Sequence, residues 1–294
     1  MHSVEISAAA RVIAILVISL ACIAPPSRAE GPSSATIEAF DRYVAAAESH
    51  AREELATNKN FLYLDALPEP QHAQNYAALR RGQTLVQRSL QCEPRCPAIA
   101  GGLLHDWTGI IFVPGVTLAQ TLAALQDYDR DTVYYQPQVI SAKLLSSSEN
   151  HFRVFLRLKQ THVITVALDT EYEIQYTTLD TAHAASQSHS TRISEVENAG
   201  SSQERVSSPG DDHGFLWRLY SYWRFYQADG GVYIQCNAIS LTRDVPAGLG
   251  WLIGPFIQNI PQESLRFTLT ATRQALLQKF RNAPESKPVK GEPK

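Results

Sequence analysis

Hydrophobic side chains recur every three or four residues in several segments of the chain, and this spacing is typical of helices that bury one face. In the first of these segments Ile37, Phe40 and Val44 begin an apolar stripe, while the other side of the predicted helix is charged. In the last, Pro261 suits the first helical position, because the N–H that it lacks would have no partner there. The predicted helices span about residues 33–55, 71–79, 116–125 and 261–281.

Elsewhere the hydrophobic period changes to two, which predicts β-strands. The predicted strands span about residues 83–90, 102–113, 138–147, 152–159, 163–178, 183–197, 215–227 and 232–242. Asp229, Gly230 and Gly231 predict a tight hairpin between the last two, whereas residues 159–163 mark a turn so weakly that one continuous strand is an alternative there. A run of strands closed by a helix predicts an α+β fold, in which the C-terminal helix covers one face of an antiparallel sheet.

The two ends of the chain are predicted to lie outside this fold. Residues 12–24 form an apolar run that follows Arg11 and precedes two prolines, and Ala29 provides a small residue at which a signal peptidase could cleave. The run is short for a bilayer span, although an uncleaved membrane anchor is the alternative. We therefore expect residues 1–29 to be a signal peptide and the protein to be periplasmic or secreted. The tail, residues 282–294, is rich in Pro, Lys and Glu and is predicted to be disordered.

The cysteines beyond the signal segment predict one disulfide and one free thiol. Cys92 and Cys96 lie close together in a chain predicted to be exported, which favours a local disulfide. A thioredoxin-type redox site would have two intervening residues and not three, and a zinc site would need further ligands, of which only His105 is near in sequence. Cys236 lies within an apolar strand pattern and is expected to be buried and free.

Composition narrows the classes of function. The 294 residues are 44% hydrophobic and 19% charged, which supports a folded core. Lys and Arg number 26 against 29 Asp and Glu, and no basic stripe is present, so a nucleic acid is not an expected partner. The nine histidines show no metal-ligand spacing, and neither a Gly-x-Ser-x-Gly motif nor a nucleotide-binding glycine pattern occurs. We therefore predict no catalytic residue, metal or cofactor.

The segment from Val113 to Leu145 carries a resemblance to a known family. A Val-Pro-Gly-Val turn precedes an amphipathic helix ending in Asp127-Tyr128, and Tyr134-Tyr135-Gln136-Pro137 then leads into a strand. This order resembles the START-like superfamily, also called SRPBCC or helix-grip proteins, which includes polyketide cyclases and coenzyme Q-binding START domains. The stretches at residues 214–219 and 239–246 are also similar to exported bacterial proteins. The resemblance covers residues 101–281 and leaves residues 30–100 as an N-terminal extension with an amphipathic helix and one extra strand.

The resemblance implies a curved antiparallel sheet that grips the C-terminal helix, with an apolar cavity between them for a lipid or other hydrophobic small molecule. The residues expected to line it alternate along the last two strands and recur on the helix, although they would serve equally to fill an ordinary core. They are Trp217, Leu219, Trp223, Phe225, Val232, Ile234, Cys236, Leu265, Leu269 and Leu276. The glycine-rich stretch at residues 247–256 is expected either to form a gate that transiently touches a membrane surface or to be a buried turn. Its gate residues are Gly250, Trp251 and Phe256.

Three functions follow as alternatives. The first is an exported carrier of a hydrophobic small molecule. The second is an enzyme of the same fold, of the cyclase, dehydratase or hydrolase kind, which would need two or more ionisable side chains to converge inside the cavity. Arg218, Tyr222 and Arg224 would supply such groups only if the strand faces were inverted. The third is an envelope interaction module that uses the stripe of the helix at residues 37–55.

Overall fold

The computed structural model describes residues 31–57, 60–89, 92, 95–161, 165–208, 212–244 and 250–281, and the side chains of residues 250–258 are outside that description. The predicted signal peptide and the predicted disordered tail lie outside the described residues. Among the described helices, none combines the length and the apolar character needed to cross a bilayer.

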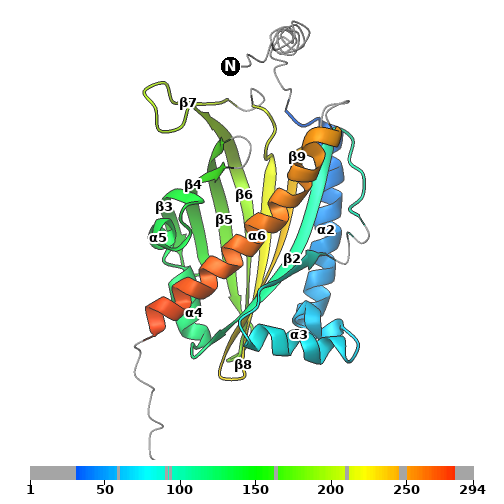
Figure 1. Ribbon diagram of the computed structural model, residues 1–294, viewed down its shortest axis with the longest axis vertical. Coiled ribbons are helices and arrows are strands. Elements are labelled where there is room, and N and C mark those ends of the chain that lie inside the picture. Colours follow the sequence, from blue (N-terminus) through cyan, green and yellow to red (C-terminus); the bar gives the residue numbers. More distant parts are fainter. Residues whose placement is uncertain are drawn as a thin grey trace, which may run out of the picture.

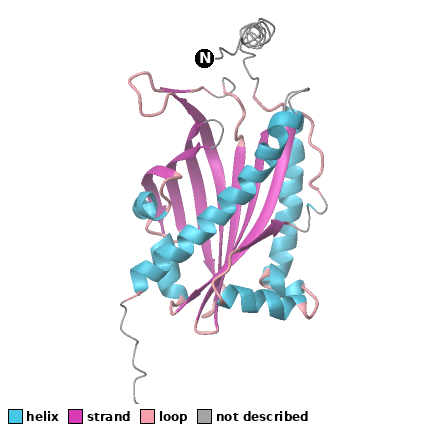
Figure 2. Ribbon diagram, in the orientation of Figure 1, coloured by secondary structure: helices cyan, strands magenta, loops and turns pink. Residues whose placement is uncertain are grey.

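One antiparallel sheet forms the centre of the molecule (Figure 2). Its strands are β1 (Leu85–Arg88), β2 (Gly102–Pro114), β3 (Val139–Ser148), β4 (His151–Thr161), β5 (Thr165–Thr178), β6 (His183–Glu197), β7 (Arg205–Val206), β8 (Arg218–Ala228) and β9 (Gly231–Arg243). The order across the sheet is β1-β2-β9-β8-β6-β5-β4-β3, and the short β7, which lies between the predicted strands at 183–197 and 215–227, pairs with β6. Thr161 pairs with Thr165, so β4 and β5 are two strands and not one.

Helices lie on both sides of this sheet. They are α2 (Ser34–Thr57), η1 (Tyr63–Ala66), α3 (Gln71–Arg80), α4 (Leu118–Leu125), η3 (Tyr128–Arg130), α5 (Asp131–Tyr134) and α6 (Gly250–Phe280). In Figure 1 the long α6 crosses one side of the sheet diagonally. We call this side the α6 face and the opposite side, which carries α2, η1 and α3, the α2 face. The α+β arrangement with a C-terminal helix laid across an antiparallel sheet is confirmed.

The alternation of side chains along β9 explains how both faces become buried. Ile234 and Cys236 pack with Leu269 of α6 in the core of the α6 face. Ile239 and Leu241 have odd sequence numbers, so their side chains point to the opposite side of the strand. They pack on the α2 face. Further along, η1 and α3 cover a third apolar cluster that contains Tyr233. The sheet is therefore buried from both sides.

The predicted N-terminal extension is part of this same fold. Phe40 is fully buried and Val44 nearly so, because the stripe of α2 packs against the sheet. Strand β1 pairs with β2 at the edge of the same sheet. The stripe is therefore occupied within the chain, and the interaction-module alternative loses the observation on which it rested.

Helix α6 begins eleven residues before the predicted start at Pro261. It begins at Gly250, so Pro261 lies inside the helix and the segment expected to be a glycine-rich bridge is helical from Gly250 onward. Proline favours the first helical turn, but inside a helix it removes only its own hydrogen bond and bends the axis, and packing can compensate for this. The side chains of the gate residues Trp251 and Phe256 lie outside the described residues, so their role as a gate stays a prediction.

The hairpin between β8 and β9 is confirmed. Asp229 and Gly230 both have positive φ angles, 53° and 71°, as a two-residue connection of this kind requires. The turn fixes the register of the two strands, and this register decides which of their side chains face α6.

Candidate functional site

Most of the residues predicted to hold a ligand form the core of the α6 face. Ile234, Val232 and Leu269 are fully buried, and they belong to one cluster in which α6 packs on the sheet. Trp223 is partly buried and packs against this cluster. The members of the predicted set in this cluster are Phe225, Val232, Ile234, Cys236, Leu265, Leu269 and Leu276. Leu219 is half-buried on β8 and shares the parity of Trp223.

Trp217 is the exception, and its predicted position was wrong. It packs on the α2 face with Phe40, Ile239 and Leu241. Strand β8 begins at Arg218, so Trp217 lies just before it. The alternation of side chains along the strand therefore does not determine which way the Trp217 side chain points. In contrast, Tyr222 and Arg224 lie on the α2 face, where the sequence predicted them.

Helix α6 covers the sheet unevenly. It packs mainly on β2, and it also contacts β1 and β9. On the strands farther along the sheet, Val154, Tyr176 and Phe225 are buried on the α6 face. Five other apolar side chains of this face are only half-buried; they are Leu144, Phe152, Leu156, Ile174 and Trp223. Beside them β6 carries small, buried side chains on the same face, Ala184, Ser186 and Ser188. We call these residues together the half-covered apolar surface.

A cleft opens where α6 passes the β3–β4 edge of the sheet. Its volume is about 600 Å³. Gln160 donates a hydrogen bond of 2.7 Å to Ser264 of α6 at this place. Val139, Ile140 and Phe267 supply apolar walls, and Lys159 lines the cleft as well. None of the ten predicted ligand residues lines this cleft, and seven of them lie in the packed core of the α6 face.

Ionisable side chains also gather on the α6 face, between the sheet and α6. The hydroxyl groups of Tyr128 and Tyr176 are 3.0 Å apart, and the Tyr135 hydroxyl lies 3.0 Å from that of Thr272 on α6. Asp131 is buried in α5 beside them, and burial, together with the charges of two neighbouring aspartates, raises the pKa of its carboxyl group to about 8. Burial likewise raises the pKa of Tyr176 to about 12.

Part of this polar group was visible in the sequence. Tyr128 and Tyr135 stand in the segment that carries the family resemblance, whereas Asp131 and Tyr176 were missed. Asp131 belongs to an acidic run that resembles an exposed turn, and Tyr176 lies at an ordinary alternating position of β5. Only the tertiary structure brings them together.

The two cysteine predictions are confirmed. Cys92 and Cys96 form a disulfide, and Cys236 is a buried free thiol. Burial among apolar side chains raises the pKa of the Cys236 thiol far above its usual range. Cys236 is therefore an apolar core residue and not a nucleophile.

Comparison with known proteins gives structural similarity only. No family model matches the chain, and no curated protein matches it. A STAR-related lipid transfer protein from Xanthomonas axonopodis is similar with 15% identity and a TM-score of 0.40, over 62% of this chain and 96% of that chain.

Two further solved structures are similar to the same extent. The Zhui aromatase/cyclase from a Streptomyces species has 10% identity and a TM-score of 0.41, over 62% of this chain and 98% of that chain. A START superfamily protein from Mycobacterium smegmatis has 8% identity and a TM-score of 0.41, over 60% of this chain and 99% of that chain. START proteins and an aromatase/cyclase are thus among the solved structures to which this chain is similar.

Proposed function

We propose that this protein binds a lipid or another hydrophobic small molecule against the α6 face of its sheet and acts as a carrier for it. The half-covered apolar surface is the observation that carries the proposal. Phe152, Leu156, Ile174 and Trp223 keep part of their apolar area in contact with solvent in a fold that otherwise buries its core well. Covering such area with a ligand gains about 25 cal/mol per Å².

The cleft between α6 and the β3–β4 edge supports the same proposal. Its volume of about 600 Å³ lies within the range of small-molecule sites. Lys159, Gln160 and Ser264 offer polar contacts at its walls, while Phe267 offers an apolar one. An amphipathic molecule would place its polar end here and its apolar part toward the half-covered apolar surface.

We also propose that this binding takes place outside the cytoplasm. The apolar run at residues 12–24 and the cleavage pattern at Ala29 support export. The Cys92–Cys96 disulfide supports it as well, because disulfides persist mainly in oxidising compartments. The first turns of α6, with Trp251 and Phe256, are the proposed place of transient contact with a membrane surface during ligand exchange.

An enzyme of the same fold is the second candidate. It is supported by the gathering of Asp131, Tyr128, Tyr135 and Tyr176 on the α6 face. An aspartate with a pKa of about 8 is protonated at neutral pH and can donate a proton to a bound molecule. If the protein is an enzyme, Asp131→Asn will abolish turnover of the bound molecule and leave its binding intact, whereas a carrier will show no turnover before the substitution either.

The carrier proposal can be tested with a pair of matched substitutions on β6. Ser188→Phe adds a large side chain at a buried position of the α6 face, and Gln187→Phe adds the same side chain on the opposite face, where residue 187 is exposed. Protein purified from its own host is examined by native mass spectrometry, and binding of a fluorescent fatty-acid probe is titrated. We expect a retained hydrophobic molecule in the wild type, and loss of probe binding in Ser188→Phe alone.

Two results would overturn the carrier proposal. One is a wild-type protein that retains no hydrophobic molecule and does not bind the probe. The other is equal probe binding by the wild type and both variants, since this would place the probe away from the α6 face. Thermal unfolding of each variant shows whether it is folded.

A further inference from the structure

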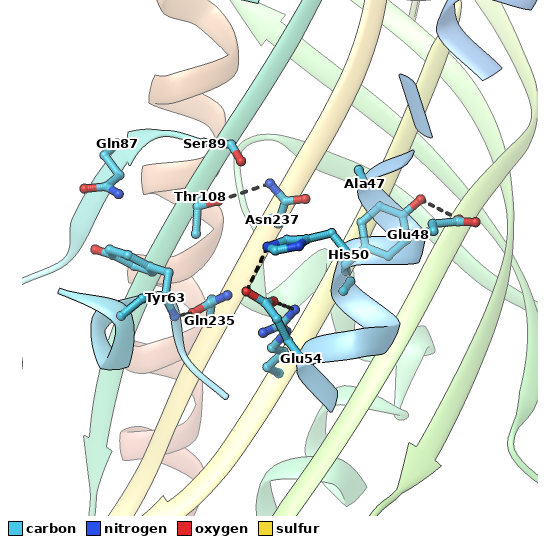
Figure 3. Close-up of a pocket in the computed structure, with 14 residues that line it drawn as sticks. Ala47, Glu48, His50, Glu54, Tyr63, Gln87, Ser89, Thr108, Gln235 and Asn237 are labelled. Atoms are coloured by element: carbon cyan, nitrogen blue, oxygen red, sulfur yellow. Dashed lines mark hydrogen bonds and ion pairs between the residues drawn. The ribbon is translucent and has the colours of Figure 1, made fainter. Parts of the chain in front are cut away.

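A second pocket lies on the other side of the sheet, between α2 and the α2 face. Residues from α2, η1, β1, β2, β8 and β9 line it, and its volume is about 90 Å³ (Figure 3). The sheet separates it from the α6 face, so it is distinct from the site proposed above. We call it the α2 pocket.

The charged groups of the α2 pocket are already paired. Glu48 accepts a hydrogen bond of 2.8 Å from the Tyr222 hydroxyl, and His189 Nε2 lies 3.0 Å from the same carboxylate oxygen. Glu54 pairs with His50 at 3.2 Å and with Arg224. Because both carboxylates have a partner within the protein, the pocket offers no uncompensated charge to attract an ion.

The floor of the pocket offers one hydrogen-bond donor and one acceptor. Gln235 is 5% exposed, and its Oε1 accepts a bond of 2.7 Å from the backbone N–H of Tyr63. This bond identifies Oε1 as the acceptor of the amide, so Nε2 is the donor that Gln235 offers to the pocket that it lines. Two residues along β9, Asn237 donates through Nδ2 to Asp106 and Thr108, which leaves Oδ1 as the acceptor.

Figure 3 shows these two amides between Thr108 on one side and His50 and Glu54 on the other. A molecule bound in the pocket can accept a hydrogen bond from Gln235 Nε2 in place of water. A hydroxyl group donates and accepts at the same time, so a molecule with adjacent hydroxyl groups satisfies both amides. Ala47 and Ala51 supply small apolar walls for its carbon atoms.

We propose that the α2 pocket binds a small neutral polyol. The charge pairing favours a neutral ligand over an ion, and the donor and acceptor of the floor favour hydroxyl groups. A volume of about 90 Å³ holds roughly six to nine water-sized groups. This corresponds to a molecule of three or four carbons with a hydroxyl group on each, such as glycerol or erythritol.

The test uses three molecules of one size and different charge. Glycerol, glycerate and the amine serinol are titrated against the full-length protein by saturation-transfer NMR and calorimetry, together with erythritol. We expect saturable binding of the neutral polyols and binding of glycerate and serinol that is weaker by at least about tenfold. Binding that favours the anion or the amine would overturn the proposal, and so would a protein that binds none of the four, since the pocket would then hold water only.

Two substitutions on α2 locate the binding. Ala51→Leu fills the pocket, whereas Ala46→Leu adds the same side chain on the exposed side of the helix. We expect Ala51→Leu to weaken polyol binding at least about tenfold and Ala46→Leu to leave it unchanged. A third variant, Gln235→Leu, removes the open donor, and thermal unfolding reports whether it is folded. If polyols bind all three variants equally, they bind elsewhere and the proposal is wrong.

Discussion

At the scale of single residues, Gly109 shows how closely α6 approaches the sheet. A Cβ atom at this position would lie 2.5 Å from Cδ1 of Leu269 and 3.1 Å from Cγ2 of Val86. Glycine is therefore needed here for space and not for an unusual backbone conformation. It allows the core of the α6 face to close over β2.

We expect Gly109→Ala to lower the free energy of unfolding by about 1–3 kcal/mol, because the added methyl group overpacks the contact with α6. Urea unfolding measures this. Leu269→Ala alone should cost about 2–5 kcal/mol, and the double variant should cost less than the sum of the two because the smaller side chain makes room. Additive costs would show that the two residues do not compete for the same space.

His105 gives the protein a sensitivity to acid. Its Nε2 lies 3.2 Å from the Thr242 hydroxyl, and burial, together with the charge of Arg88, lowers the pKa of the imidazole to about 4. The ordinary value is 6.5, so the unfolded chain binds a proton at a pH where the folded protein does not. Stability is therefore lost as the pH falls from 6.5 toward 4, with a slope of up to about 1.4 kcal/mol per pH unit. Unfolding of His105→Gln over this range should show a shallower slope, and equal slopes would contradict the assignment.

Asp131 has the opposite dependence. Its pKa is raised from 3.8 to about 8, so between these values the folded protein holds a proton that the unfolded chain releases. Stability is therefore lost as the pH rises through this range, again by up to about 1.4 kcal/mol per pH unit. Asp131→Asn should remove this loss and gain stability relative to the wild type as the pH increases. If the free energies of unfolding of the wild type and the variant differ by the same amount at every pH, Asp131 is not a buried, protonated group.

At the scale of elements, the sequence pattern located the strands closely but could not place the helices against them. Strand β6 matches its predicted bounds, β2 differs by one residue at one end and β9 by one residue at each end, because alternation and turn residues are local signals. The start of α6 was wrong because the preference of proline for a first turn is a tendency that packing overrides. The gathering of Asp131 with Tyr176, and the polar lining under α2, depend on residues far apart in sequence, which no local pattern reports.

The docking of α2 leads to a prediction for this element. Phe40 is fully buried against Tyr220 and the sheet, with ring centres 5.4 Å apart, whereas the neighbouring Asp41 is exposed. We expect Phe40→Ala to lower the free energy of unfolding by about 3–5 kcal/mol and Asp41→Ala to change it by less than about 0.5 kcal/mol. Denaturant unfolding of both variants checks this. A Phe40→Ala variant whose unfolding splits into two transitions would instead show that α2 detaches as a separate unit.

At the scale of the whole molecule, one sheet presents two different chemistries because its side chains alternate. Trp223 and Arg224 are neighbours on β8, yet the first faces the half-covered apolar surface and the second lines the α2 pocket. Each face has its own core clusters, so filling one site leaves the packing of the other unchanged. We therefore expect Ser188→Phe to alter polyol binding, and Ala51→Leu to alter binding of the hydrophobic probe, by less than about twofold. Titration of each ligand against both variants measures this, and a larger effect in both directions would show that the sheet itself shifts when either face is occupied.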